Sequence, residues 1–157
     1  MPAPTLNRVV SDFKCPSTGG EPFQLKAQRG KHVVLYFYPK DATPGCTTEG
    51  KDFRDLHARF KRHNAIVAGI SRDSLASHEK FRTKHGFPFE LLSDEDETVC
   101  RKFDVIQEKS LYGRKFMGIE RSTFLIDSAG KLRAEWRKVR VKDHAEEVLQ
   151  AVKDLDK

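Results

Sequence analysis

The feature that most constrains this chain is an unbroken apolar run at residues 32–38, HVVLYFY. Such a run of β-branched and aromatic side chains is typical of a strand that is buried on both faces. Pro39 follows directly and predicts the end of the strand, because proline cannot donate a hydrogen bond to a sheet. The run therefore predicts a layered domain with this strand near its centre.

A helix is predicted directly after this strand. Thr43 is a favourable N-cap residue, and Pro44 suits the first helical position. Asn64 is expected to close the helix, whose apolar residues recur at helical spacing and are separated by charges: Phe53, Leu56 and Phe60.

Strands and helices alternate along the rest of the chain. Further strands are predicted at residues 65–70, 87–92, 122–127 and 132–139, and helices at 74–85, 97–103 and 143–155. Residues 104–121, with Tyr112, Gly113, Met117 and Gly118, read as a polar loop. The order predicts an α/β fold in which a central mixed sheet is flanked by helices and preceded by a short extension, although other small α/β folds also fit.

Length and composition limit the class of protein. With 157 residues and 38% hydrophobic residues, the chain is expected to form one domain over residues 1–157 rather than a disordered chain. No apolar run approaches the ~20 residues of a membrane helix, and the first residues do not resemble a signal peptide. We therefore expect a cytoplasmic protein without a membrane partner.

The positive charge has a simple interpretation. Lys and Arg number 29 and Asp and Glu 23, which gives 29 − 23 = +6. Basic residues are spread along the chain and mixed with acidic ones, with denser stretches at 59–63 and 133–142. We interpret this as a solvated surface rather than a nucleic-acid site, because binders of nucleic acid concentrate their charge.

The three cysteines point to thiol chemistry. They are odd in number and far apart, which excludes a disulfide framework. Cys46 lies at the predicted helix start, where unpaired N–H groups and the helix dipole favour a thiolate, the nucleophilic form. Thr43 could place its hydroxyl beside that sulfur. A buried, inert cysteine is the alternative, but the Pro-Gly pair before Cys46 places it on an irregular turn.

Three motifs carry a family resemblance. Pro39, Thr43 and Cys46 form a P-x-x-x-T-x-x-C pattern within YFYPKDATPGCTTEGKDFRD, and FELLSDEDETVCRKFDV and RSTFLID follow in order. This chain resembles the peroxiredoxins, and in particular their bacterioferritin comigratory protein or peroxiredoxin Q branch. The resemblance covers nearly the whole chain. It implies a thioredoxin-like fold, thiol-dependent reduction of hydrogen peroxide and organic hydroperoxides, and no metal, haem or flavin cofactor.

The resemblance also implies roles for residues. Cys46 would be the peroxidatic cysteine, Thr43 would bond its sulfur and the peroxide, Pro39 would shield the thiolate, and Arg121 would be the active-site arginine. A fixed guanidinium suits this chemistry, because negative charge moves from sulfur to the departing oxygen. The six histidines show no metal-ligand spacing, which agrees with a metal-free site.

The resolving step departs from the family pattern. Many members of this branch carry a resolving cysteine five residues after the peroxidatic one, but Lys51 stands there. Cys100 reads as a packed core residue, and Cys15, in a turn-rich stretch, is expected to be more exposed. We expect a one-cysteine mechanism in a monomer, with thioredoxin, glutaredoxin with glutathione, or another small thiol as reductant. A two-cysteine mechanism through Cys100 or Cys15 is the alternative.

Two other functions remain open from the residues alone. A thiol–disulfide oxidoreductase normally carries C-x-x-C, whereas Thr43 and Glu49 occupy the positions three residues from Cys46. A basic binding or chaperone-like protein would agree with the charge but would leave the motif around Cys46 unexplained.

Overall fold

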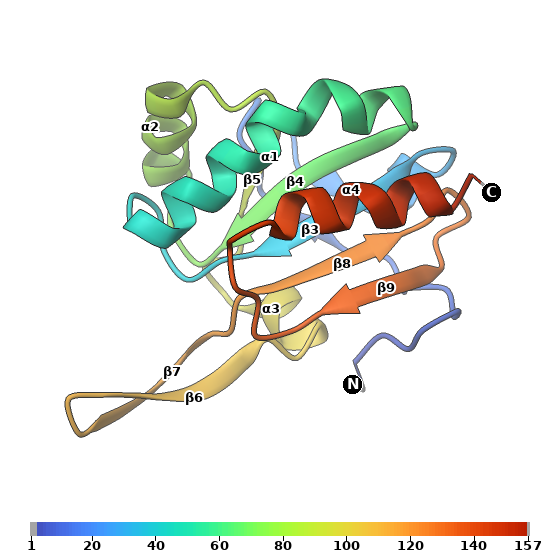
Figure 1. The fold of residues 1–157 in the computed structure, drawn as a ribbon. Helices are drawn as coiled ribbons and strands as arrows, with labels where there is room; N and C mark the ends of the chain where they lie inside the picture. The colour runs from blue at the N-terminus through green and yellow to red at the C-terminus, as the bar shows by residue number, and fades with distance from the viewer. Residues whose placement is uncertain (1–2, 157) are drawn as a thin grey trace.

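The computed structural model describes residues 3–156, and its centre is a five-stranded mixed sheet (Figure 1). The strands are β3 (His32–Phe37), β4 (Ala65–Ser71), β5 (Glu90–Ser93), β8 (Ser122–Ile126) and β9 (Leu132–Trp136), in the order β5-β4-β3-β8-β9. Strands β3, β4 and β5 are parallel, whereas β8 is antiparallel to both of its neighbours. The predicted mixed sheet, with the apolar run at its centre, is confirmed.

Helices and a short hairpin cover the two faces of this sheet. One face carries α1 (Pro44–Arg62), α2 (Leu75–His85) and α4 (His144–Asp154). The other carries α3 (Thr98–Lys102) and the N-terminal hairpin of β1 (Lys14–Cys15) and β2 (Phe23–Gln24), which a 3-10 turn at Lys26–Gln28 follows. The expected N-terminal extension is therefore part of the packed structure.

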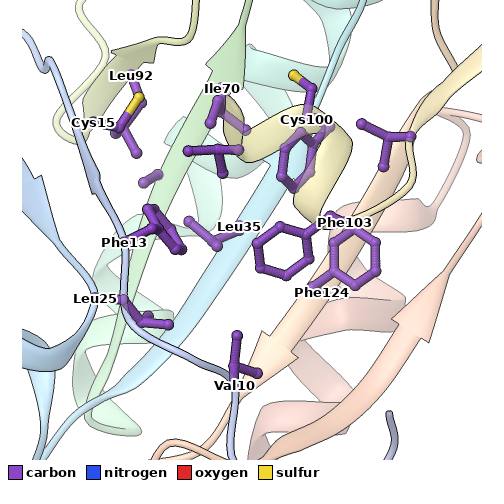
Figure 2. Packing of buried hydrophobic residues seen from close by; sticks show 14 of the residues in the cluster. Val10, Phe13, Cys15, Leu25, Leu35, Ile70, Leu92, Cys100, Phe103 and Phe124 are labelled. Atoms are coloured by element: carbon purple, nitrogen blue, oxygen red, sulfur yellow. The ribbon is translucent and has the colours of Figure 1, made fainter. Parts of the chain in front are cut away.

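Two hydrophobic cores result, because successive side chains of a strand point to opposite faces. Val34, Tyr36 and Tyr38 enter the core beneath α1 and α4, which we call the helix-side core. Val33, Leu35 and Phe37 enter the core on the other face, which we call the hairpin-side core. Figure 2 shows part of the latter.

The predicted helix boundaries are largely confirmed. Thr43 is the N-cap of α1 and Pro44 its first residue. Ser74 caps α2 by accepting a hydrogen bond from the backbone of Ser77, and Gly86 ends it in the left-handed conformation. Within residues 3–156, no helix is long and apolar enough to cross a membrane.

Three predictions of elements were wrong, and one of them is the end of β9, which lies at Trp136 rather than at residue 139. The supposed polar loop at 104–121 contains a hairpin of β6 (Ile106–Leu111) and β7 (Arg114–Ile119), which projects from the body. Only the base of this hairpin is buried, so its strands lack the apolar pattern of packed strands. Strand β5 begins at Glu90 rather than residue 87, because Pro88 cannot donate a hydrogen bond to the sheet, although Phe87 and Phe89 still pack in the helix-side core.

Candidate active site

Cys46 is the third residue of α1, and sheet pairing places Arg121 beside it. Strand β3 leads through a short loop into α1, so Cys46 lies beyond the carboxyl end of the central strand. Strand β8 is antiparallel to β3 with Phe37 opposite Ser122. Arg121, the residue before β8, therefore reaches the same end of the sheet although it is 75 residues away from Cys46.

The arginine contacts both the thiol and a carboxylate. Its Nη2 donates to the Cys46 Sγ at 3.3 Å, and its Nη1 donates to the Glu49 Oε1 at 2.5 Å. Gly45 makes room for this approach, because a Cβ at that position would lie 3.2 Å from Nη2. Cys46 itself is 2% exposed. The site thus holds a nearly buried sulfur against a fixed positive charge.

Glu49 is the site residue to which the sequence analysis assigned no role. It lies one turn after Cys46 on α1 and is 1% exposed. Burial raises the pKa of this carboxyl to about 7, although the neighbouring Arg121 opposes the shift. Its Oε2 is buried and has no hydrogen-bond partner among the described residues. The sequence signal that could have identified Glu49 was its position three residues after Cys46, because residues three apart on a helix share a face.

Thr43 and Pro39 lie where the motif predicted, on the loop between β3 and α1, and both are half-buried. The Thr43 hydroxyl donates to the Lys40 carbonyl oxygen at 2.8 Å and forms no cap hydrogen bond with the helix. The Thr43 hydroxyl proton is therefore used in the hydrogen bond to Lys40, and the lone pairs of the hydroxyl oxygen remain available to accept a hydrogen bond.

A buried polar network holds this loop. Asp41 is 6% exposed and accepts hydrogen bonds from Tyr38 (2.6 Å) and Ser77 (2.8 Å), while its backbone amide donates to Asp73 (2.9 Å). His78 lies 2.7 Å from the Asp41 carboxylate. Asp41, Asp73 and His78 are close enough together to hold a metal ion, but all three already bond to other protein groups. We interpret the cluster as an anchor of the loop.

The other two cysteines lie in the hairpin-side core, away from Cys46, and Figure 2 shows both among its apolar side chains. Cys100 is fully buried, as expected from its apolar neighbours. Cys15 is 1% exposed, so the expectation of an exposed Cys15 was wrong. It shares the inward face of its segment with Phe13, and its thiol points to the Ser93 carbonyl at 3.5 Å. Burial raises the pKa of both thiols.

The geometry defines what the site can do. A thiol at a helix N-terminus, beside a guanidinium, is placed to become a nucleophilic thiolate. The same guanidinium can stabilise negative charge that develops on a bound oxygen. Cys100 is also the third residue of a helix, α3, but the Asp94 carboxylate lies beside it and its pKa is raised, and the described residues give neither Cys100 nor Cys15 a hydrogen bond from a guanidinium.

Comparison with known proteins agrees with this site. The model of the AhpC/TSA family matches residues 6–135. The chain belongs to this family. It is 51% identical over 150 residues to "Peroxiredoxin Bcp" of Bacillus subtilis, with 96% of each chain covered. The identity with "Peroxiredoxin Bcp" of Xanthomonas campestris is 50% over 153 residues, covering 98% of this chain and 92% of the relative.

Solved structures place the chain in the same branch. Xanthomonas campestris peroxiredoxin Q is 50% identical, with a TM-score of 0.88 and 92% of each chain covered. A cysteine-to-serine variant of Xylella fastidiosa PrxQ is 41% identical, with a TM-score of 0.94 and complete coverage of both chains. The expected thioredoxin-like fold and family are confirmed, and the protein is a peroxiredoxin, a thiol peroxidase of the Bcp/peroxiredoxin Q branch.

Proposed function

We propose that this peroxiredoxin reduces hydrogen peroxide and organic hydroperoxides by a one-cysteine mechanism, with Cys46 as the peroxidatic residue. The contact between the Arg121 guanidinium and the Cys46 sulfur carries the proposal. A similar solved protein, the bacterioferritin comigratory protein of Xanthomonas campestris, has alkyl peroxide reduction activity, which supports the substrate class.

The first step is displacement on the O–O bond. The Cys46 thiolate attacks the terminal oxygen of the hydroperoxide, an S–O bond forms and the O–O bond breaks. Sulfur loses two electrons and becomes a sulfenic acid, while the departing alkoxide or hydroxide takes a proton and leaves as alcohol or water. Arg121 stabilises the thiolate before the reaction and the charge on the departing oxygen during it.

Thr43 and Pro39 position the peroxide in this proposal. Because the Thr43 hydroxyl donates to Lys40, its oxygen can accept the hydrogen bond of an incoming hydroperoxide. Pro39 has no amide hydrogen, and its proposed role is to shield the thiolate from water. The backbone amides at the start of α1 supply further donors near the sulfur.

An external thiol then resolves the sulfenic acid. The placement of Cys15 and Cys100 in the other core, on the far side of the sheet, supports this route over an internal disulfide. The incoming thiol forms a mixed disulfide with Cys46 and releases water, and a second thiol frees the Cys46 thiolate. A protein dithiol of the thioredoxin or glutaredoxin type, or glutathione, can supply both thiols.

Peroxide consumption by single cysteine variants tests the proposal. With dithiothreitol as reductant, Cys46→Ser should lower turnover by at least about 10³-fold, because the nucleophile is lost. Cys15→Ser and Cys100→Ser serve as matched controls and should keep more than about half of the wild-type turnover if their folds are intact by circular dichroism. Normal turnover by Cys46→Ser would refute the proposed role.

A further inference from the structure

The β6–β7 hairpin presents two different sides, and one of them faces the active site. In the antiparallel register, Lys109 pairs with Phe116, Leu111 with Arg114, and Gln107 with Gly118. Because paired residues share a face, these side chains lie on one side of the hairpin. Glu108 and Lys115 lie on the opposite side and form an ion pair at 3.6 Å.

The side that faces the site is identified by Lys109, whose amine lies within electrostatic reach of both Arg121 and Cys46. A Cβ on Gly118 would lie 3.3 Å from both the Lys109 stem and the Phe116 ring, so these two side chains lie over the glycine. Burial and the nearby Arg121 charge lower the pKa of Lys109, which is also within electrostatic reach of Cys46. The side with Lys109, Phe116, Leu111 and Arg114 is therefore the site-facing side.

This side is apolar and cationic. Phe116 is 45% exposed and Leu111 is 57% exposed, although both are large and hydrophobic. Arg114 is exposed and forms no ion pair within residues 3–156. Exposed apolar residues beside free cations are typical of a binding surface rather than of a packed hairpin.

A second cationic segment flanks Arg121. The loop from residue 137 to residue 142, RKVRVK, contains no acidic residue. Its Val139 amide donates to the Arg121 carbonyl at 2.9 Å, so the loop lies against the backbone of the active-site arginine. Lys138, Arg140 and Lys142 are exposed, and the described part of the chain offers them no ion-pair partner. In Figure 1, the hairpin and this loop lie at the same end of the molecule as the start of α1.

We infer that the site-facing side of the hairpin and the loop 137–142 together form the docking surface for an acidic protein that carries the reducing dithiol. The inference rests on the proposed function, which requires an external thiol. Electrostatic attraction between the cationic surface and an acidic partner would speed the encounter. Phe116 and Leu111 would pack against apolar residues around the partner's cysteine.

The size of the surface favours a protein over a small thiol. From Gly118 to Gly113 the strand spans five residues, about 16 Å at 3.3 Å per residue. Tyr112, at the tip, is 97% exposed. A small thiol that reaches the Cys46 sulfur would leave the outer half of the hairpin without a contact, whereas a globular partner would cover it.

The hairpin offers matched variants for a test. Arg114→Glu, combined with Lys138→Glu, reverses two charges on the proposed surface, and Lys115→Glu reverses one on the opposite side of the same hairpin. Phe116→Ala and Met117→Ala form a second pair, since Met117 is similarly exposed at 51% but shares the side of Glu108. Circular dichroism establishes that each variant is folded.

Turnover is measured with an acidic thioredoxin and its reductase, and in parallel with uncharged dithiothreitol. Arg114→Glu/Lys138→Glu should lower kcat/KM for thioredoxin by about tenfold at low salt, and the loss should shrink as salt rises. Phe116→Ala should raise the KM for thioredoxin several-fold. Lys115→Glu and Met117→Ala should stay within about twofold of wild type, and turnover with dithiothreitol should not change.

Several results would overturn the docking surface while leaving the peroxidase function intact. One is that the wild-type protein turns over peroxide with dithiothreitol but not with thioredoxin. Others are equal losses in both members of a matched pair, or a Phe116→Ala effect on the KM for a long-chain alkyl hydroperoxide instead of thioredoxin. A change in oligomeric state with Phe116→Ala would assign the surface to a second copy of the chain. Failure of the wild type with dithiothreitol would instead refute the proposed function.

Discussion

The helix-side and hairpin-side cores both bury cysteine, but they surround it with opposite charges. In the helix-side core, the Cys46 sulfur receives a hydrogen bond from the Arg121 guanidinium. In the hairpin-side core, the Cys100 amide donates to the Asp94 carboxylate at 2.7 Å, and the Cys15 thiol meets a carbonyl oxygen. Burial, together with the Asp94 charge, raises the pKa of both of these thiols.

The difference shows that burial alone does not decide what a cysteine does. All three side chains are at most 2% exposed. A desolvated thiolate is stable only where donors or positive charge replace the lost water. The helix N-terminus and Arg121 provide that replacement at Cys46, whereas the surroundings of Cys15 and Cys100 favour the neutral thiol.

The largest expected effect comes from making the Cys46 surroundings more like those of Cys100. Arg121→Met removes the guanidinium but keeps much of the side-chain length. The second-order rate constant with hydrogen peroxide should fall by about 10²–10³-fold, because both the thiolate and the departing oxygen lose their positive neighbour. Stopped-flow measurement of peroxide reduction gives this rate constant directly.

The Arg121→Met variant needs a control, because it also removes the ion-pair partner of the Glu49 carboxylate. Removing Arg121 leaves Glu49 buried without its partner, which destabilises the fold. The double variant Arg121→Met/Glu49→Gln removes that charge and should recover stability but not the peroxide rate. Recovery of the rate as well would mean that Arg121 acts through the fold and not on the reacting atoms.

Glu49→Gln tests the comparison further by removing a buried carboxylate that lies one helical turn from Cys46. The folded-state pKa of Glu49 is about 7, above its ordinary value of 4.5, so folding favours the protonated form. The protonated Glu49 carboxyl therefore stabilises the folded state fully below pH 4.5, and this stabilisation is lost as the pH rises towards 7. Over that window the wild type should lose about 3 kcal/mol of unfolding free energy relative to Glu49→Gln.

Denaturant unfolding of both proteins between pH 4.5 and pH 8 measures this difference. Divergence of the two curves across the window is the expected result, with the variant becoming relatively more stable as pH rises. Parallel curves would mean that Glu49 is already ionised at low pH through its contact with Arg121.

The smallest effects on activity are expected in the hairpin-side core. Cys100→Ala and Cys15→Ala should each cost about 1–2 kcal/mol of unfolding free energy through the small cavity that each leaves. Peroxide turnover should remain within about twofold of wild type, since neither thiol takes part. A large fall in thioredoxin-dependent turnover for a variant of normal stability would identify that cysteine as a resolving residue.

Local sequence signals predicted most of the fold. The uninterrupted apolar run identified β3, and Thr43, Ser74 and Gly86 marked helix ends because their chemistry acts within a few residues. The β6–β7 hairpin was missed, since its strands protrude and do not need an apolar face. The signal that was available is its two-residue turn, in which Tyr112 and Gly113 both have positive φ, at 51° and 78°.

The site was less visible in the sequence than the fold. The position of Cys46 at a helix start could be argued from Thr43 and Pro44 alone. Its pairing with Arg121 follows from the register of β8 on β3, which residue spacing does not report and which only the family resemblance supplied. The burial of Cys15 likewise depends on the folding of the N-terminal hairpin over the sheet.

Mass spectrometry after one equivalent of hydrogen peroxide, with a sulfenic-acid trap present, tests the one-cysteine mechanism most directly. Intact mass counts the modified thiols, and peptide analysis assigns them. The trapped adduct should be at Cys46, with Cys15 and Cys100 still free thiols. A disulfide from Cys46 to either of them would contradict the mechanism and would require the two cores to rearrange during turnover.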